Sequence, residues 1–134
     1  MDIYTDGSSD VGKKLIGYAA YDGEGNHIVS GWRNGEGSNT AELTAIYESL
    51  FRVPNGTNVT FHVDSNNVIG WLMKDWKSKA LNIKELLHNI ELRKNLHGIL
   101  ISVVKTEGHS GVWQNELADK KAAEMLNAAR KAAA

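Results

Sequence analysis

The fold is decided by residues 39–64, NTAELTAIYESLFRVPNGTNVTFHVD, because the hydrophobic period changes within them. Apolar residues three and four positions apart predict an amphipathic helix: Leu43, Ile46, Tyr47, Leu50 and Phe51. The turn at residues 54–56 ends that helix, and residues 59–63 have the β-branched and aromatic composition of a strand that stops at Asp64. A helix between two strands is a crossover, which implies that the strands it joins are parallel.

Three strands are expected before this crossover. Residues 3–5 form a short strand that runs into a turn or bulge at residues 6–8. Residues 15–21 and 27–32 flank the glycine-rich segment 22–26, which is typical of a hairpin turn. Strands so close together in sequence favour an antiparallel meander.

Two more helices, a strand and a last helix are expected after Asp64. The second and third helices are marked by two apolar stripes: Val68, Ile69, Leu72, Met73 and Trp76, then Ile83, Leu86, Leu87 and Ile90. Residues 99–104 are almost continuously apolar, which predicts a strand covered on both faces. A polar loop at 106–111 precedes a helix from about Trp113. The order βββαβααβα predicts an α/β fold in which helices flank a five-stranded mixed sheet.

Composition restricts the class of protein. The chain has 134 residues, 42% hydrophobic and 23% charged, which is typical of one globular domain over residues 1–134. The absence of cysteine excludes disulfides, thiolate metal sites and a cysteine nucleophile. No apolar run approaches about 18 residues, and the acidic N-terminus does not resemble a signal peptide. We expect a cytoplasmic monomer with no membrane segment and no obligate protein partner.

Charge is unevenly distributed along the chain. Residues 1–64 carry nine acidic residues against Lys13, Lys14, Arg33 and Arg52, whereas residues 71–94 have a net charge of +3. The second segment is either an ordinary solvated pair of helices or a cationic face that meets phosphates. Composition alone leaves both interpretations open.

Four acidic residues are predicted to meet at one edge of the sheet. Asp6 ends the first strand and Asp64 the fourth, Glu42 is placed in the first turn of the crossover helix, and Asp119 lies one to two turns into the last helix. Open α/β sheets place their sites at the carboxyl edge of the strands. Crowded carboxylates raise one another's pKa unless a cation neutralises them, and all-oxygen ligands suit Mg²⁺ or Mn²⁺. Two such ions about 4 Å apart are the usual arrangement for phosphodiester cleavage.

Each acid also has a structural interpretation that the residues alone leave open: Asp6-Gly7 as a turn, Glu42 as the capping-box partner of Asn39, Asp64 or Ser65 as a helix cap, and Asp119 as the partner of Lys120 or Lys121. Together these interpretations do not explain why acids mark corresponding ends of several elements. His109 lies in a polar loop between glycines, where an imidazole is able to move a proton near a leaving oxygen. The other four histidines show no ligand spacing and are interpreted as structural.

Five motifs in this order resemble those of the ribonuclease H type 1 family: residues 4–8 (YTDGS), 39–43 (NTAEL), 63–65 (VDS), 108–111 (GHSG) and 115–119 (NELAD). The resemblance covers essentially the whole chain. It implies a ribonuclease H-like fold and an endonuclease that uses two Mg²⁺ ions, with Mn²⁺ as a possible substitute. Its substrate would be an RNA/DNA hybrid, whose RNA strand is hydrolysed to 5′-phosphate and 3′-hydroxyl ends.

The resemblance also implies individual roles. Asp6 would bridge both ions, Asp119 would complete the ion that activates water, and Glu42 with Asp64 would complete the ion at the leaving oxygen. His109 would assist product departure. For substrate binding, Asn39 and Asn66 are candidates for contacts across the minor groove, where 2′-hydroxyls distinguish RNA from DNA, and Ser65 for a phosphate contact.

The chain departs from the family in two places. The interval between Asp64 and His109 is too short for the long basic protrusion of many members, so we expect weaker hybrid affinity than in members that have it. The segment 9–14, SDVGKK, replaces a glycine-rich turn after the first acid.

Three other functions are compatible with parts of the pattern. One is a related nuclease or strand-transfer domain that acts on DNA, and another is a catalytically inert relative that binds hybrids. The third is a metal-dependent adhesion module, but residues 6–10, DGSSD, lack the second serine of its D-x-S-x-S motif.

Overall fold

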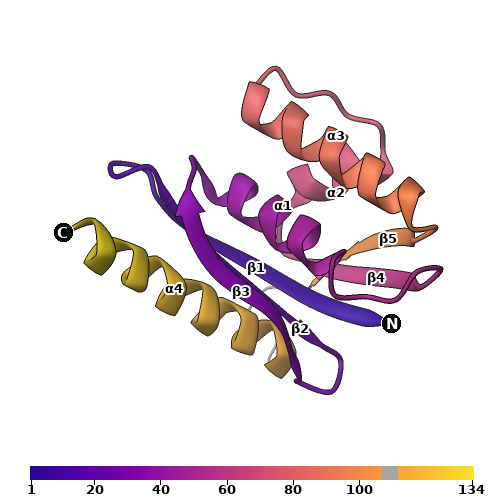
Figure 1. Ribbon diagram of the computed structural model, residues 1–134, viewed down its shortest axis with the longest axis horizontal. Coiled ribbons are helices and arrows are strands. Elements are labelled where there is room, and N and C mark those ends of the chain that lie inside the picture. Colours follow the sequence, from indigo (N-terminus) through magenta and orange to yellow (C-terminus); the bar gives the residue numbers. More distant parts are fainter. Residues whose placement is uncertain (107–111) are drawn as a thin grey trace.

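Five strands form one mixed sheet with the order β3-β2-β1-β4-β5 (Figure 1). The structure is a computed structural model that describes residues 1–106 and 112–134. The strands are β1 (Asp2–Asp10), β2 (Leu15–Asp22), β3 (His27–Asn34), β4 (Asn58–Val63) and β5 (Leu100–Lys105), and the helices are α1 (Ser38–Ser49), α2 (Asn66–Met73), α3 (Leu81–Leu96) and α4 (Trp113–Ala133). The predicted order of elements and the mixed α/β sheet are confirmed.

Strand pairing follows the prediction of a meander followed by a crossover. β1 pairs antiparallel with β2, and β2 pairs antiparallel with β3. β1 pairs in parallel with β4, and β4 pairs in parallel with β5. The helix α1 is thus the crossover between the antiparallel and parallel halves of the sheet.

β1 is longer than the sequence predicts. The prediction ended the strand at Asp6 and placed a turn at residues 6–8, whereas β1 continues to Asp10. The reason is its second neighbour, because pairing with β2 runs on to Asp10↔Leu15 after the last parallel pair with β4, Tyr4↔His62. Asp6 therefore lies in the middle of a strand, at the point where the parallel neighbour ends.

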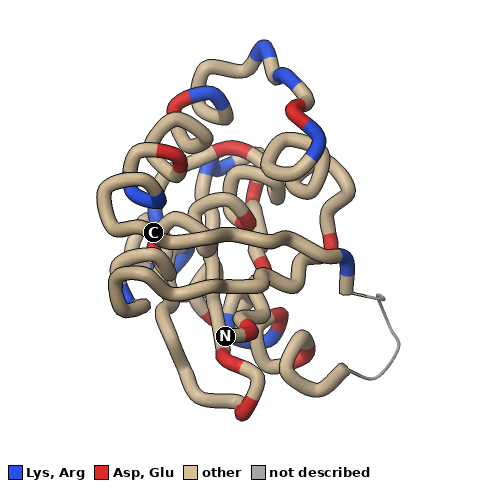
Figure 2. The backbone as a smooth tube through the Cα atoms, turned by 90° about the vertical axis from the view of Figure 1, so that its right-hand side faces the viewer, with Lys and Arg blue, Asp and Glu red and all other residues tan. Residues whose placement is uncertain are grey.

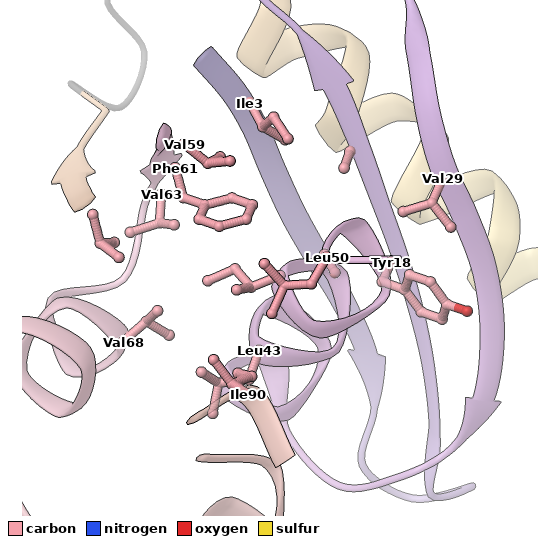
Figure 3. Packing of buried hydrophobic residues seen from close by; sticks show 14 of the residues in the cluster. Ile3, Tyr18, Val29, Leu43, Leu50, Val59, Phe61, Val63, Val68 and Ile90 are labelled. Carbon is pink, nitrogen blue, oxygen red and sulfur yellow. The ribbon is translucent and has the colours of Figure 1, made fainter. Parts of the chain in front are cut away.

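Helices cover the two faces of the sheet in different ways. α4 packs on β1, β2 and β3, while α1 lies on the opposite face with α3 outside it (Figure 1). Gly17 of β2 permits the close approach of α4, because a Cβ there would lie 2.3 Å from the Ala122 carbonyl oxygen. The main core lies on the α1 side and includes Phe61, Leu43 and Ile90 (Figure 3).

Three local predictions are wrong. The first helix is not amphipathic, since α1 is buried continuously from Thr40 to Ile46 between the sheet and α3. Trp76 lies outside α2, which ends at Met73 before Asp75 adopts a left-handed φ of 57°. The fifth strand is exposed on one face, because β5 is at the sheet edge and α4 packs only on β1–β3.

Within the described ranges, no helix combines the length and the apolar character that crossing a lipid bilayer requires.

Candidate active site

Asp6 and Asp64 belong to adjacent parallel strands. The last parallel pair is Tyr4↔His62, so each acid follows that pair by two residues along its own chain. Continuing the register brings Asp6 level with Asp64, which directly follows β4. The prediction that both acids emerge at the same edge is therefore consistent with the observed pairing.

Glu42 approaches Asp6 from α1, and Gly7 makes this possible. A Cβ at Gly7 would lie 2.4 Å from the Cβ of Ala41 and 2.6 Å from the backbone nitrogen of Glu42. Helix and strand thus touch at the glycine that follows Asp6. The Glu42 side chain is only 4% exposed, and its Oε1 accepts a hydrogen bond of 2.5 Å from the Thr5 hydroxyl.

The position of Glu42 within α1 differs from the prediction. The N-cap of α1 is Gly37, so Glu42 lies in the second turn rather than the first, and the first turn contains no acid. The capping-box interpretation is wrong because Asn39 is inside the helix. The acid projects toward the middle of β1, where the Thr5 hydroxyl donates to it, instead of capping its own helix.

Asp119 reaches the site from the other face of the sheet. It lies in α4, which packs on β1, and its side chain lies within hydrogen-bonding reach of the side chain of Asp6. The proposed pairing of Asp119 with Lys121 does not occur, since Lys121 pairs with Glu124. Asp6 therefore interacts with acids from two helices, Asp119 of α4 and Glu42 of α1.

The proximity of other acids changes the ionisation of Asp6 and Glu42. Burial, the hydrogen bond with Asp119 and the charges of Asp119 and Asp64 raise the pKa of Asp6 to about 7, although the Gly7 backbone N–H opposes this. Burial and the charges of Asp6 and Asp64 raise the pKa of Glu42 well above its usual range. No ion pair among the described residues includes any of these four acids. The negative charge of these acids is therefore not neutralised by an ion pair with any Lys, Arg or His that the structure describes.

A small hollow of about 290 Å³ opens at the acids. Its lining combines β1, α1 and the segment after β4: Asp6, Gly7, Ser38, Asn39, Glu42, Asp64 and Ser65. All three acids in this lining offer only oxygen atoms, the ligand type that Mg²⁺ and Mn²⁺ prefer. The hollow is therefore chemically suited to a hard divalent cation.

The donor set fits magnesium without forming a closed cage. No group of three His, Asp or Glu side chains within residues 1–106 and 112–134 forms a ready-made metal site. Mg²⁺ does not require one, because it keeps several waters and usually takes one or two protein carboxylates together with substrate phosphates. The three carboxylates that line this hollow are compatible with that mode of binding.

Two of the three residues predicted to bind substrate, Asn39 and Ser65, line the same hollow as the acids. The Ser65 hydroxyl accepts a hydrogen bond from the Val68 backbone N–H, so Ser65 and not Asp64 caps α2. The same hydroxyl donates to Oδ1 of Asn39, at 2.7 Å. Asn66 is exposed in the first position of α2. The structure thus joins Asn39 and Ser65, and leaves the Asp64 carboxylate free of any capping role.

His109 lies outside the described residues, so its role stays a prediction. Among the other histidines, His62 stacks on Tyr4 and bonds Asp2 on the open face of the sheet, away from the hollow. Sequence reasoning missed Thr5, whose hydroxyl reaches Glu42. The sequence feature that could have indicated Thr5 is the alternation of side chains along a strand, which places Thr5 on the same face of β1 as Gly7.

Comparison with known proteins gives a consistent result. The RNase H family model matches residues 1–127. A ribonuclease HI from Haemophilus ducreyi is 31% identical over 135 residues, which cover 91% of this chain and 87% of the relative. The N-terminal RNase H domain of a Mycobacterium tuberculosis protein has a TM-score of 0.77 at 17% identity and covers 99% of both chains. LC11-RNase H1, solved in complex with an RNA/DNA hybrid, has a TM-score of 0.74 at 22% identity and covers 96% of this chain and 97% of its own.

Proposed function

Because the chain belongs to the RNase H family, we propose that it is a metal-dependent nuclease that hydrolyses the RNA strand of RNA/DNA hybrids. The products would carry 5′-phosphate and 3′-hydroxyl ends. The observation that carries this proposal is the group of four converging acids, which have no cationic partner among the described residues. Such a group is unfavourable unless a bound cation neutralises it.

The four acids divide naturally around Asp6. Asp119 contacts Asp6 from α4, while Glu42 and Asp64 share the hollow with Asp6. This arrangement supports the role that the family resemblance implies for Asp6, which is to serve both sides of the site. A pair of Mg²⁺ or Mn²⁺ ions, when bound, supplies an activated water and neutralises charge on the phosphate.

Asn39 is proposed to read the minor groove with its amide N–H groups. Its Oδ1 is occupied by the Ser65 hydroxyl, so the side chain presents Nδ2 as a donor next to the acids. Donors at this position suit the oxygen acceptors of the minor groove, including 2′-hydroxyls. Ser65 supports this role by orienting Asn39, and Asn66 extends the same polar surface.

The test compares three labelled substrates with and without Mg²⁺: an RNA/DNA hybrid, double-stranded RNA and double-stranded DNA. We expect cleavage of the RNA strand of the hybrid alone, only with Mg²⁺, and products whose mobility matches 5′-phosphate ends. Asp64→Asn should abolish cleavage, whereas Asp2→Asn, a matched change of an acid at the start of β1 whose side chain is 59% exposed, should keep parental activity.

Two outcomes would replace the proposal. Cleavage of duplex DNA without cleavage of the hybrid would favour a DNA-directed relative of the same fold. Tight binding of the hybrid without any cleavage would identify a catalytically inert member.

A further inference from the structure

Thr5 joins β1 to the side chain of Glu42. It is fully buried, and its hydroxyl donates a hydrogen bond of 2.5 Å to Glu42 Oε1 across 37 positions of sequence. Among the described residues it is the only hydroxyl, amide or cationic side chain that donates to this carboxylate. The Asp6 carboxyl also lies within hydrogen-bonding reach of Glu42, but it is itself an acid and repels Glu42 when both are ionised. The Thr5 hydroxyl is a neutral donor that can orient the ionised Glu42 carboxylate.

The alternation of β1 explains why Thr5 reaches Glu42. Ile3 belongs to the core on the α1 side, and Gly7 touches the α1 backbone, so Thr5 between them lies on the same face. Asp6, the next residue, interacts with Asp119 of α4 and also lines the hollow that contains Glu42. Two successive residues of β1 thus interact with acids from different helices: Thr5 with Glu42 of α1, and Asp6 with Asp119 of α4.

We propose that Thr5 is a positioning residue for metal binding, whose hydroxyl fixes Oε1 of Glu42 and leaves Oε2 as the oxygen available to a divalent cation. This inference rests on the proposed function, because it assigns Glu42 to the metal centre. Thr5 acts through Glu42 and does not itself touch metal or substrate. Groups that orient metal ligands in this way commonly change affinity or activity by about 10–100-fold when they are removed.

The experiment measures Mn²⁺ binding by titration calorimetry in the absence of nucleic acid, alongside hybrid cleavage over a range of Mg²⁺ concentrations. Thr5→Val removes the hydroxyl and keeps the branched shape, and we expect about 10-fold weaker Mn²⁺ binding. Thr5→Ser keeps the donor and should retain most of the parental affinity. Cleavage by Thr5→Val should need more Mg²⁺ but recover most of its rate at saturation, because the carboxylate itself is unchanged.

Thr44→Val is the matched control. Thr44 is 1% exposed and its hydroxyl donates to the Thr40 carbonyl oxygen, so the same atoms change at a buried site on α1 without contact to Glu42. This variant should bind Mn²⁺ as the parent does. A double-mutant cycle adds a second test, because Thr5→Val should have no further effect on Mn²⁺ binding in a Glu42→Gln background.

The outcomes separate this inference from the proposed function. Parental Mn²⁺ affinity and Mg²⁺ dependence in Thr5→Val would overturn the role of Thr5 and leave the nuclease intact. A parent that binds Mn²⁺ but cleaves no hybrid would overturn the proposed function, while a weakened Thr5→Val would still support the positioning role. Equal losses in Thr5→Val and Thr5→Ser would reduce Thr5 to a packing residue. If Thr5→Val fails to fold, Thr5→Ala takes its place in the same titration.

Discussion

At the scale of single residues, Asp6 is the acid whose chemistry depends most on its neighbours. Its pKa of about 7 means that the folded protein holds a proton on this carboxyl over a pH range where the unfolded chain, with a pKa near 3.8, has released it. Stability therefore falls as pH rises from about 4 to about 7, because the native state binds more protons than the unfolded state. Above about pH 7 the Asp6 carboxylate is ionised, and the folded protein is destabilised by the whole free energy of that buried charge unless a cation neutralises it.

Asp6→Asn is expected to abolish cleavage and yet stabilise the metal-free protein. At pH 8 with a chelator, urea denaturation should give a free energy of unfolding higher than the parent's by on the order of 2 kcal/mol, because a crowded buried charge is removed. At pH 4 the two proteins should differ much less. The matched control Asp75→Asn should lie within about 0.5 kcal/mol of the parent at both pH values. Lower stability of Asp6→Asn at pH 8 would show that the carboxylate is well compensated without metal.

The pair formed by Asn39 and Ser65 illustrates how one hydroxyl serves two elements. Ser65 caps α2 through its oxygen and uses its proton to orient the Asn39 amide on α1. A serine directly after Asp64 therefore fixes the start of α2 and the polar wall of the hollow together. This coupling explains why the acid itself takes no part in capping.

At the scale of elements, the contact between β1 and α1 decides whether a site exists. The α1 backbone lies directly against Gly7 of β1, and Glu42 belongs to the part of α1 in contact with it. The opposite face of β1 receives α4, whose end is tied to the strand by an ion pair of 2.9 Å between Arg130 and Asp10. Both helices that carry acids of the site, α1 with Glu42 and α4 with Asp119, therefore pack on β1.

Gly7→Ala should separate β1 from α1 and disrupt the site. The added methyl group cannot fit within 2.6 Å of the Glu42 backbone nitrogen, so the helix must shift. We expect a loss of about 1–3 kcal/mol in the free energy of unfolding and a fall in cleavage rate of about 100-fold or more.

Gly12→Ala provides the control for this prediction. A Cβ at Gly12 would meet only Asp10 Oδ1 at 3.7 Å, in ordinary contact. Urea denaturation and specific activity should therefore stay near parental values. A Gly7→Ala protein with full activity would mean that α1 adjusts without moving Glu42.

At the scale of the whole molecule, charge is separated between the carboxylate site and one end of the protein. Figure 2 shows Lys and Arg gathered at the loop between α2 and α3, at the top of the view. A groove of about 890 Å³ lies there, and its lining includes Lys77, Lys79 and Lys84. This short loop occupies the place along the chain where many relatives are expected to carry a longer basic segment. Such a surface is suited to phosphate contacts.

Replacing the two loop lysines, Lys77→Ala with Lys79→Ala, should weaken hybrid binding without changing the rate at saturation. Each lost phosphate contact lowers the slope of log affinity against log salt by about 1, so KM should rise at low salt and depend less on salt. Lys131→Ala, at the far end of α4 from Trp113, serves as the control and should leave both quantities unchanged. An unaltered salt slope in the double variant would place the hybrid elsewhere on the surface.

The sequence by itself determined the order of the elements and the identity of the acids. Periods of two and of three to four residues, together with glycine and proline turns, are local signals, so they predicted nine elements in the observed order. The parallel pairing of β1 with β4, which the predicted site requires, is shown by the structure. Local signals also located Asp6 and Asp64 at the ends of a shared register. They erred where a second neighbour extends β1 and where the sheet edge leaves Leu100 65% exposed.

Only the tertiary structure decided how those acids behave. The depth of Glu42, its bond with Thr5 and the raised pKa of Asp6 arise from groups brought together by packing across 37 positions of sequence or more. Desolvation and charge interactions depend on distance and burial in space, and neither is encoded in the spacing of residues along the chain. The sequence identified the acidic residues, and the packing of α1 and α4 on β1 brings them together into the candidate site.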